Sequence, residues 1–150
     1  MSRISTEQIV DEVTFEVERG KIREFARATH ARDQVHTDPA IARASGFDNV
    51  LATPTHVVVA GHHRDQRGFV ESLGLAMERV VVGKVRWEYF RPLTAGDSLR
   101  GRRRVVSDER REGKRSGQMR LITLATDYVD GRGDVVVRQS EVLVERGERP

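Results

Sequence analysis

Apolar and polar residues alternate in the segment EVTFEVERG, which covers residues 12–20. Val13, Phe15 and Val17 fall on one side of this segment, while acidic and hydroxyl residues fall on the other, as in a strand with one buried face. The next segment, KIREFARAT (residues 21–29), carries apolar residues at helical spacing. The pattern therefore predicts a half-buried strand followed by a short amphipathic helix.

Two more helices are predicted before the middle of the chain. In DPAIARASG (residues 38–46), Asp38 suits a helix N-cap, a proline follows at the first helical position, and Gly46 suits the helix end. The segment at residues 53–73 begins with Thr-Pro and is apolar on every side over residues 57–61, which is typical of a buried helix. Its β-branched residues would also fit a strand, but its start and its length favour one long helix.

Extended patterns dominate the second half of the chain. Strands are predicted in four runs, at residues 80–90, 97–107, 118–129 and 134–145. The turn sequences RPLTAGD (residues 91–97) and DGRGD (residues 130–134) separate some of these runs. The layout predicts one α+β domain over residues 1–150, with a long central helix on an antiparallel sheet whose last four strands form a meander.

Composition and charge narrow the function classes. Only 37% of the residues are hydrophobic, and such a lean core favours an oligomer. Lysine and arginine total 26 against 23 acidic residues, and the densest basic run, at residues 100–115, contains acidic residues and no aromatic ones. This run does not fit nucleic-acid binding, and we interpret it as a solvated hairpin, with an anionic carrier or a cofactor phosphate as the alternative ligand.

The chain has no cysteine, which excludes disulfides, zinc-thiolate sites and thiol nucleophiles. The first 13 residues are charged and do not resemble a signal peptide, and no run approaches the roughly 20 apolar residues that cross a bilayer. We therefore expect a cytoplasmic protein without a membrane partner. His62 and His63 point about 100° apart on a helix and have no suitably spaced acid, so no metal site is predicted.

The stretches IREFARAT, VHTDPAIARASGF, ATPTHVVV and YFRPLTAGDSL occur in this order. This succession resembles the MaoC-like branch of the hotdog fold, which contains (R)-specific enoyl-CoA hydratases and 3-hydroxyacyl-thioester dehydratases. It is most similar to the single-hotdog subunits of actinobacterial fatty-acid dehydratases, over residues 13–145. The resemblance implies a hotdog fold, in which an antiparallel sheet wraps a long central helix, and no cofactor.

The hydratase motif of that family reads Gly-Asp-x-Asn-Pro-x-His-x-Asp. By this resemblance, the motif's histidine corresponds to His36 and its last aspartate to Asp38. His30 takes the place of the glycine and Asp33 that of the asparagine. The catalytic aspartate corresponds to Ala31, so the departure affects the chemistry.

Hydration of an enoyl thioester needs a general base, a general acid, and hydrogen-bond donors for the thioester oxygen. His36 fits the acid-base role because the ordinary pKa of histidine lies near neutrality, although it could also be a surface histidine bonded within its turn. Asp33 and His30 are the further catalytic candidates. Their alternatives are an Asx-turn residue and a histidine packed between helix and loop. Thr55 and His56 are the substrate-pocket candidates, against a role in capping the helix.

Two functions of different classes follow. The first is a hydratase or dehydratase that interconverts enoyl and (R)-3-hydroxyacyl thioesters of CoA or acyl carrier protein. The second is a catalytically silent hotdog subunit that binds the acyl chain while a partner supplies the catalytic Asp and His. A hotdog thioesterase or a tailoring enzyme of a secondary pathway is less favoured. The expected partners are the acyl thioester and a second hotdog subunit, identical or different.

Overall fold

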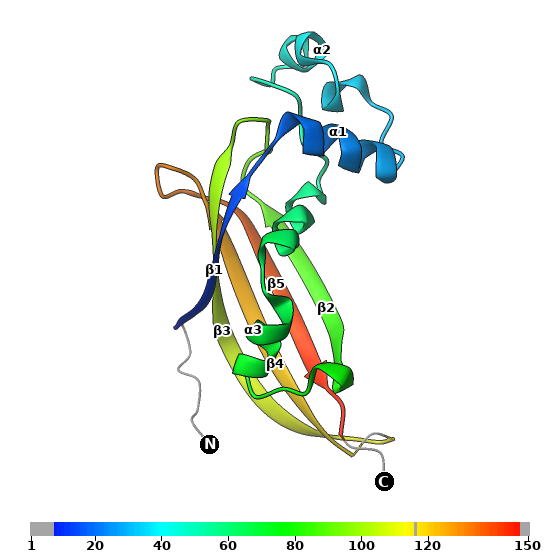
Figure 1. Cartoon of the computed structure of the whole chain (residues 1–150), viewed down its shortest axis with the longest axis vertical. Helices are drawn as coiled ribbons and strands as arrows, with labels where there is room; N and C mark the ends of the chain where they lie inside the picture. The colour runs from blue at the N-terminus through cyan, green and yellow to red at the C-terminus, as the bar shows by residue number, and fades with distance from the viewer. Residues whose placement is uncertain (1–7, 116, 148–150) are drawn as a thin grey trace.

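A five-stranded antiparallel sheet and a group of short helices make up the computed structural model, which describes residues 8–115 and 117–147 (Figure 1). The strands are β1 (Ile9–Glu16), β2 (Val80–Tyr89), β3 (Ser98–Gly113), β4 (Gly117–Val129) and β5 (Val135–Glu145). The α-helices are α1 (Arg19–Ala28), α2 (Pro39–Ala44) and α3 (Gln66–Ser72). The 3-10 helices are η1 (Gln34–His36), η2 (His56–His63) and η3 (Met77–Arg79). The predicted α+β class is thereby confirmed.

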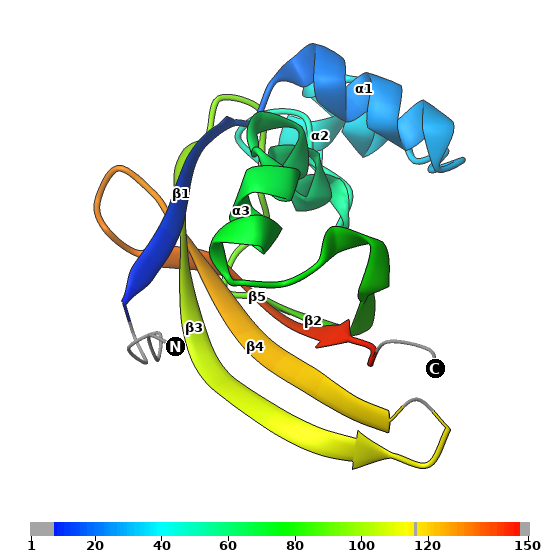
Figure 2. The same ribbon diagram turned by 60° about the horizontal axis from the view of Figure 1, so that its bottom comes forward.

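The long strands β3 and β4 curve around α3, which lies on the concave side of the sheet (Figure 2). The helices α1 and α2 lie beyond one end of the sheet (Figure 1). Both are where the sequence predicts them. For α2, the carboxylate of Asp38 accepts hydrogen bonds from the backbone N–H groups of Ala40 and Ile41, as expected of an N-cap.

The prediction of a four-strand meander is wrong in one respect. The strand order is β1-β3-β4-β5-β2, so β2 pairs with β5 at one edge and β3 pairs with β1. The segment after β2 runs across the end of the sheet, because the N–H of Phe90 bonds to the carbonyl of Val136 and the N–H of Val17 bonds to the carbonyl of Asp97. The chain therefore crosses to the side of β1 before β3 begins, and β2 remains an edge strand.

The single long helix predicted over residues 53–73 is also wrong. The chain forms η2 and then α3, with a break at Arg64 and Asp65, where Arg64 has an extended backbone (φ −110°, ψ 141°). Asp65 caps α3 by accepting a hydrogen bond from Gly68 N–H at 3.0 Å. No helix of the described residues is long and apolar enough to span a bilayer.

The apolar core of the described residues consists of two clusters with a polar belt between them. One cluster gathers around Phe15, Ile22 and Leu99, and the other around Phe69 and Leu124. The inward faces of β3, β4 and β5 change from one cluster to the other through polar residues, and so does the segment from η2 to α3. The polar belt consists of Asp11, Arg64, Arg103, Thr126 and Glu141.

Ion pairs connect this polar belt. The Arg64 guanidinium bonds to the carboxylate of Asp11, and Arg64 keeps only 2% of its side chain exposed. Arg103 lies 3.9 Å from the same carboxylate and 3.7 Å from Glu141, and it stacks on the Phe69 ring at 4.3 Å. Burial, and then the like charge of Arg64, lower the pKa of Arg103. Two buried cations thus depend on two carboxylates, of which Asp11 keeps 23% and Glu141 10% of its side chain exposed.

We predict that Asp11→Asn destabilises the protein strongly, because it leaves two buried guanidinium groups with one carboxylate. The free energy of unfolding, measured by chemical denaturation, is expected to fall by about 3 kcal/mol. The matched control is Glu12→Gln, because the neighbouring Glu12 lies 3.4 Å from Arg100 and from Arg102, with 46% of its side chain exposed. Its loss is expected to stay below about 1 kcal/mol. Equal losses in the two variants would contradict the role of the polar belt.

Candidate functional site

The loop that carries the predicted catalytic residues begins where α1 ends. His30 has φ 58°, a left-handed conformation that favours glycine, and the next N–H, of Ala31, bonds back to the Ala26 carbonyl at 2.8 Å. The glycine of the hydratase motif falls at this same position, so the backbone explains that glycine. His30 is exposed and ends the helix.

Asp33 is occupied by the backbone of its own turn. Its carboxylate accepts a hydrogen bond from Val35 N–H at 3.0 Å and caps η1. Of the two roles that the sequence suggests for Asp33, these contacts match that of an Asx-turn residue. Asp33 and His36 lie in one turn, but the Asp33 carboxylate contacts the backbone and not the imidazole.

His36 is the buried residue of this loop, with 8% of its surface exposed. Its Nδ1–H donates a hydrogen bond of 2.6 Å to the carbonyl of Leu51, while the N–H of Leu51 bonds to the carbonyl of Val35. Because the carbonyl can only accept, this bond fixes the tautomer at Nδ1. The ring therefore ties η1 to the segment that leads into η2, and Nε2 has no partner among the described residues.

A small cavity of about 160 Å³ lies beside His36. It is lined by Arg19 and Gly20 at the start of α1, by Arg23 one turn later, and by His36 and Thr37. The described part of the chain therefore provides this cavity with donors and cations and with no carboxylate. Neither arginine is among the candidates from the sequence: Arg19 falls in the segment predicted as a strand, and only the structure, in which α1 begins at Arg19, places it one turn from Arg23.

The two predicted substrate-pocket residues separate at the start of η2. Thr55 is exposed, and its side chain makes no cap bond. His56 is fully buried, with its ring 5.9 Å from that of Phe15 and 5.4 Å from that of Phe25. Neither ring nitrogen of His56 has a hydrogen-bond partner. Burial accordingly lowers the pKa of His56 to about 4, so the ring is neutral at physiological pH.

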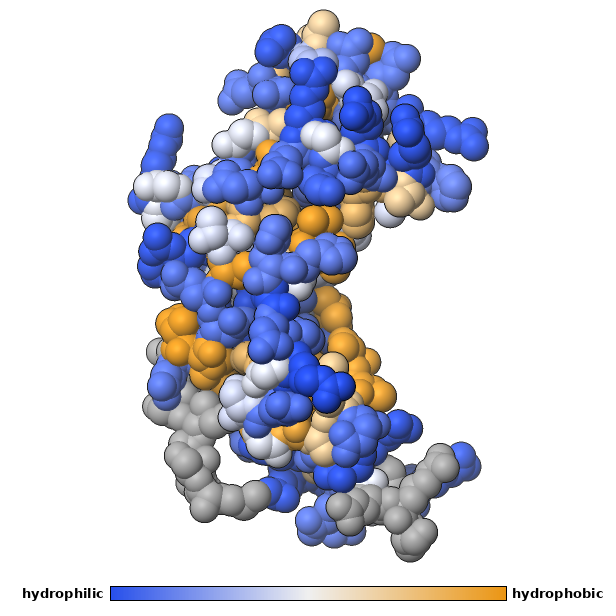
Figure 3. All heavy atoms as spheres, viewed as in Figure 1, coloured by the Kyte–Doolittle hydropathy of each residue, from blue (hydrophilic) through white to orange (hydrophobic). Residues whose placement is uncertain are grey.

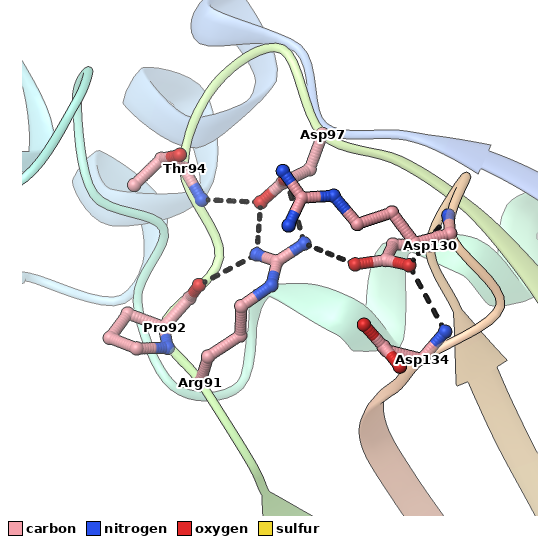
Figure 4. Close-up of polar contacts among 7 residues, drawn as sticks. Arg91, Pro92, Thr94, Asp97, Asp130 and Asp134 are labelled. Carbon is pink, nitrogen blue, oxygen red and sulfur yellow. Dashed lines mark hydrogen bonds and ion pairs between the residues drawn. The ribbon is translucent and has the colours of Figure 1, made fainter.

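Ion pairs connect the turn RPLTAGD to the turn between β4 and β5 (Figure 4). The Arg91 guanidinium donates to both oxygens of Asp97 at 2.9 and 3.1 Å and reaches Asp130 at 3.5 Å. The hydrogen bond to Asp97 raises the pKa of Arg91. Asp130 in turn accepts from the N–H groups of Arg132 and Asp134. A wider cavity of about 620 Å³ opens here, and Arg91, which lines it, already forms ion pairs with Asp97 and Asp130.

Comparison with known proteins decides the family. The sequence model of the family described as FAS1-like, dehydratase domain region, matches residues 3–139. The chain belongs to this family. A relative, the UPF0336 protein of Thermobifida fusca (strain YX), is 33% identical over 137 residues, which cover 91% of this chain and 87% of that protein.

Solved structures that match the fold of this chain are consistent with its place in the FAS1-like dehydratase family. The HadBC (3R-hydroxyacyl-ACP dehydratase) complex from Mycobacterium tuberculosis matches with a TM-score of 0.74 and 23% identity, over 89% of this chain and 94% of that one. A MaoC-like dehydratase matches with a TM-score of 0.79 and 27% identity, over 97% of this chain and 43% of the other. The hotdog fold and the MaoC-like resemblance inferred from the sequence are confirmed.

We predict that His56 makes this member of the FAS1-like dehydratase family less stable in mild acid. Its pKa is about 4 in the folded protein and about 6.5 unfolded, so between these values the unfolded state binds more protons. The stability is present in full above pH 6.5 and falls as the pH falls toward 4, by up to about 3 kcal/mol.

Denaturation curves between pH 4 and pH 7 measure this slope. His56→Leu, which cannot be protonated, is expected to lose the contribution of His56 to it. The control His63→Gln replaces an exposed histidine and is expected to keep the wild-type slope. A wild-type slope in His56→Leu would show that other groups cause the acid sensitivity.

Proposed function

We propose that this chain is the acyl-thioester-binding subunit of a hydratase or dehydratase that interconverts enoyl and (R)-3-hydroxyacyl thioesters. A second hotdog subunit supplies the catalytic carboxylate and histidine. The observation that carries this proposal is the engagement of the loop's carboxylates: Asp33 and Asp38 both cap helices. With Ala31 at the position of the motif's aspartate, His36 receives no acid-base partner from its own loop.

The edge strand β2 supports a partner of the same fold. Its side chains include Val81, Val82, Val85 and Tyr89, whose exposed fractions range from 42% to 58%. In Figure 3, apolar side chains gather at the right-hand edge, over β2. An exposed apolar edge strand is a template for pairing with another strand. A partner's edge strand would extend the sheet there, in keeping with the complex that gives the HadBC structure its name.

A single-chain hydratase is the competing function. It would need Asp33 to leave its cap on Val35 N–H and turn toward His36. In both versions the carrier of the thioester is CoA or acyl carrier protein, and we expect a cytoplasmic location.

We predict that the purified chain alone does not hydrate crotonyl-CoA above the uncatalysed rate. Co-expression with a hotdog subunit that retains the full Gly-Asp-x-Asn-Pro-x-His-x-Asp motif is expected to give a complex that turns over. Hydration is followed by the loss of enoyl-thioester absorbance. Turnover by the lone chain, about 100-fold or more above background, would establish the single-chain function instead.

A matched pair of variants assigns the role of β2 in the same experiment. Val85→Asp places a charge on the β2 edge and is expected to prevent assembly with the partner. Val106→Asp makes the same change on β3, where the exposure of the valine is 42%, close to the 44% of Val85. This control is expected to assemble normally, and failure of both variants would argue against β2 as the specific interface.

A further inference from the structure

The turn RPLTAGD (residues 91–97) takes no part in the function proposed above, yet its backbone is connected to the motif histidine. The connection runs through a short segment around Leu51. Both backbone groups of Leu51 face the motif loop: its N–H donates to the Val35 carbonyl at 2.8 Å, and its carbonyl accepts the 2.6 Å bond from the imidazole of His36. The position of the imidazole therefore depends on where Leu51 lies.

The neighbours of Leu51 bond to the turn on the opposite side of the segment. The N–H of Ala52 donates to the Leu93 carbonyl at 2.8 Å, and the N–H of Ala95 donates to the Val50 carbonyl at 3.0 Å. Leu51 itself forms an antiparallel bridge with the turn. Val50, Ala52 and Leu93 are buried, so their backbone groups have little alternative to these bonds. The turn, the short segment and the motif loop thus lie side by side as three bonded backbone stretches.

Charge holds the turn in this position (Figure 4). One carboxylate oxygen of Asp97 accepts from the N–H of Thr94 at 2.9 Å, and Arg91 donates to both oxygens of Asp97. Arg91 also forms an ion pair at 3.5 Å with Asp130, in the turn between β4 and β5. Isolated exposed ion pairs contribute little to stability. Here the two carboxylates keep only 19% and 17% of their side chains exposed, and Asp97 is bound bidentately, so the pairing is of the stronger kind.

Arg91 is the residue that joins these contacts. Without its guanidinium, the partly buried carboxylate of Asp97 would lose its cation, and an unpaired charge in such a place is costly. The carboxylate would move toward water, and the backbone that it holds at Thr94 would move with it. The bonds from the turn to the segment around Leu51 would weaken as a result.

We propose that Arg91 is a positioning residue for the motif loop: through Asp97 and the segment around Leu51, it keeps the imidazole of His36 in its bond to the Leu51 carbonyl. Arg91 acts only through these groups and is not a catalytic residue. The inference goes beyond the function proposed above and does not depend on it, because it concerns the bond of His36 whichever chain supplies the catalytic groups.

The test is nitrogen NMR of the histidine rings in the full-length chain, at about pH 8, where an ordinary histidine is neutral. The wild type is expected to show His36 as a single tautomer with the proton on Nδ1. In Arg91→Gln the signals of its two ring nitrogens are expected to shift toward one another. The Nδ1–H proton is expected to exchange with water at least about 10-fold faster, because a hydrogen bond to a charged group contributes this much or more.

Two controls separate positioning from overall stability. Arg120→Gln removes another bidentate pair, in which Arg120 donates to both oxygens of Asp108 at 2.9 and 2.7 Å. This variant is expected to lower the melting temperature and to keep the wild-type signals of His36. The ring of His56, which contacts phenylalanine rings and not the turn, is expected to keep its signals in every variant.

Asp97→Asn is the second test variant, for use also if Arg91→Gln does not fold. Its amide oxygen can still accept from the N–H of Thr94, while the ion pair with Arg91 is lost. The same shift of the His36 signals is expected. Unchanged His36 signals in either test variant would overturn the proposal, and so would an equal shift in Arg120→Gln. No turnover is measured, so the outcome is independent of the hydration assay.

Discussion

The buried ion pairs between the helical layer and the sheet are the constraint on which the rest of the structure depends. Arg64 is the residue at which the central helical segment breaks, and its guanidinium bonds to Asp11 of β1. Charges removed from water are stable only when they are paired, so the break must stay opposite Asp11 and Arg103. These ion pairs hold the end of η2 against the sheet. The rest of η2, and the preceding segment that His36 contacts, are positioned through it. The two apolar clusters on either side exclude water from the pairs.

The hydrogen bond between His36 and Leu51 connects the candidate site to the segment that these ion pairs position. The imidazole holds the motif loop against the segment leading to η2, and His36 also lines the small cavity at the start of α1. The carboxylates of the loop stabilise helix starts. The cavity beside His36 is lined by Arg19 and Arg23 and by no carboxylate of the described residues, so the imidazole has no acid-base partner there. We propose that a subunit with this loop pairs with one that has a complete motif, through the apolar edge of β2.

Most strands and turns could be predicted from the sequence because their signals are local. The alternation in β1 and the cap at Asp38 depend on a few neighbouring residues, and both are where the pattern places them. The order of the strands could not be predicted, since it depends on bonds between distant segments such as Val17 to Asp97. The break at Arg64 could not be predicted, because the Thr-Pro start and the apolar run favour a continuous helix. The position of the break depends on an ion pair between residues 53 positions apart.

Arg103 shows how a charge run can mislead. It lies among exposed arginines and was interpreted as solvated, yet its position in phase with Leu99 and Val105 places it on the buried face of β3. The period of two was the available signal, and composition obscured it. At the candidate site, the motif positions of His36 and Asp33 were found from the sequence, whereas the partners of their side chains required the fold.

The claim that His36 of this chain is not the acid-base catalyst is central to this account, and the turnover of the assembled complex tests it directly. His36→Asn can still donate a hydrogen bond to the Leu51 carbonyl, so the loop is expected to keep its shape. We predict that a complex with this change in the present chain keeps kcat within about threefold of wild type. A loss of kcat of about 100-fold or more, the share of a general acid or base, would contradict the account.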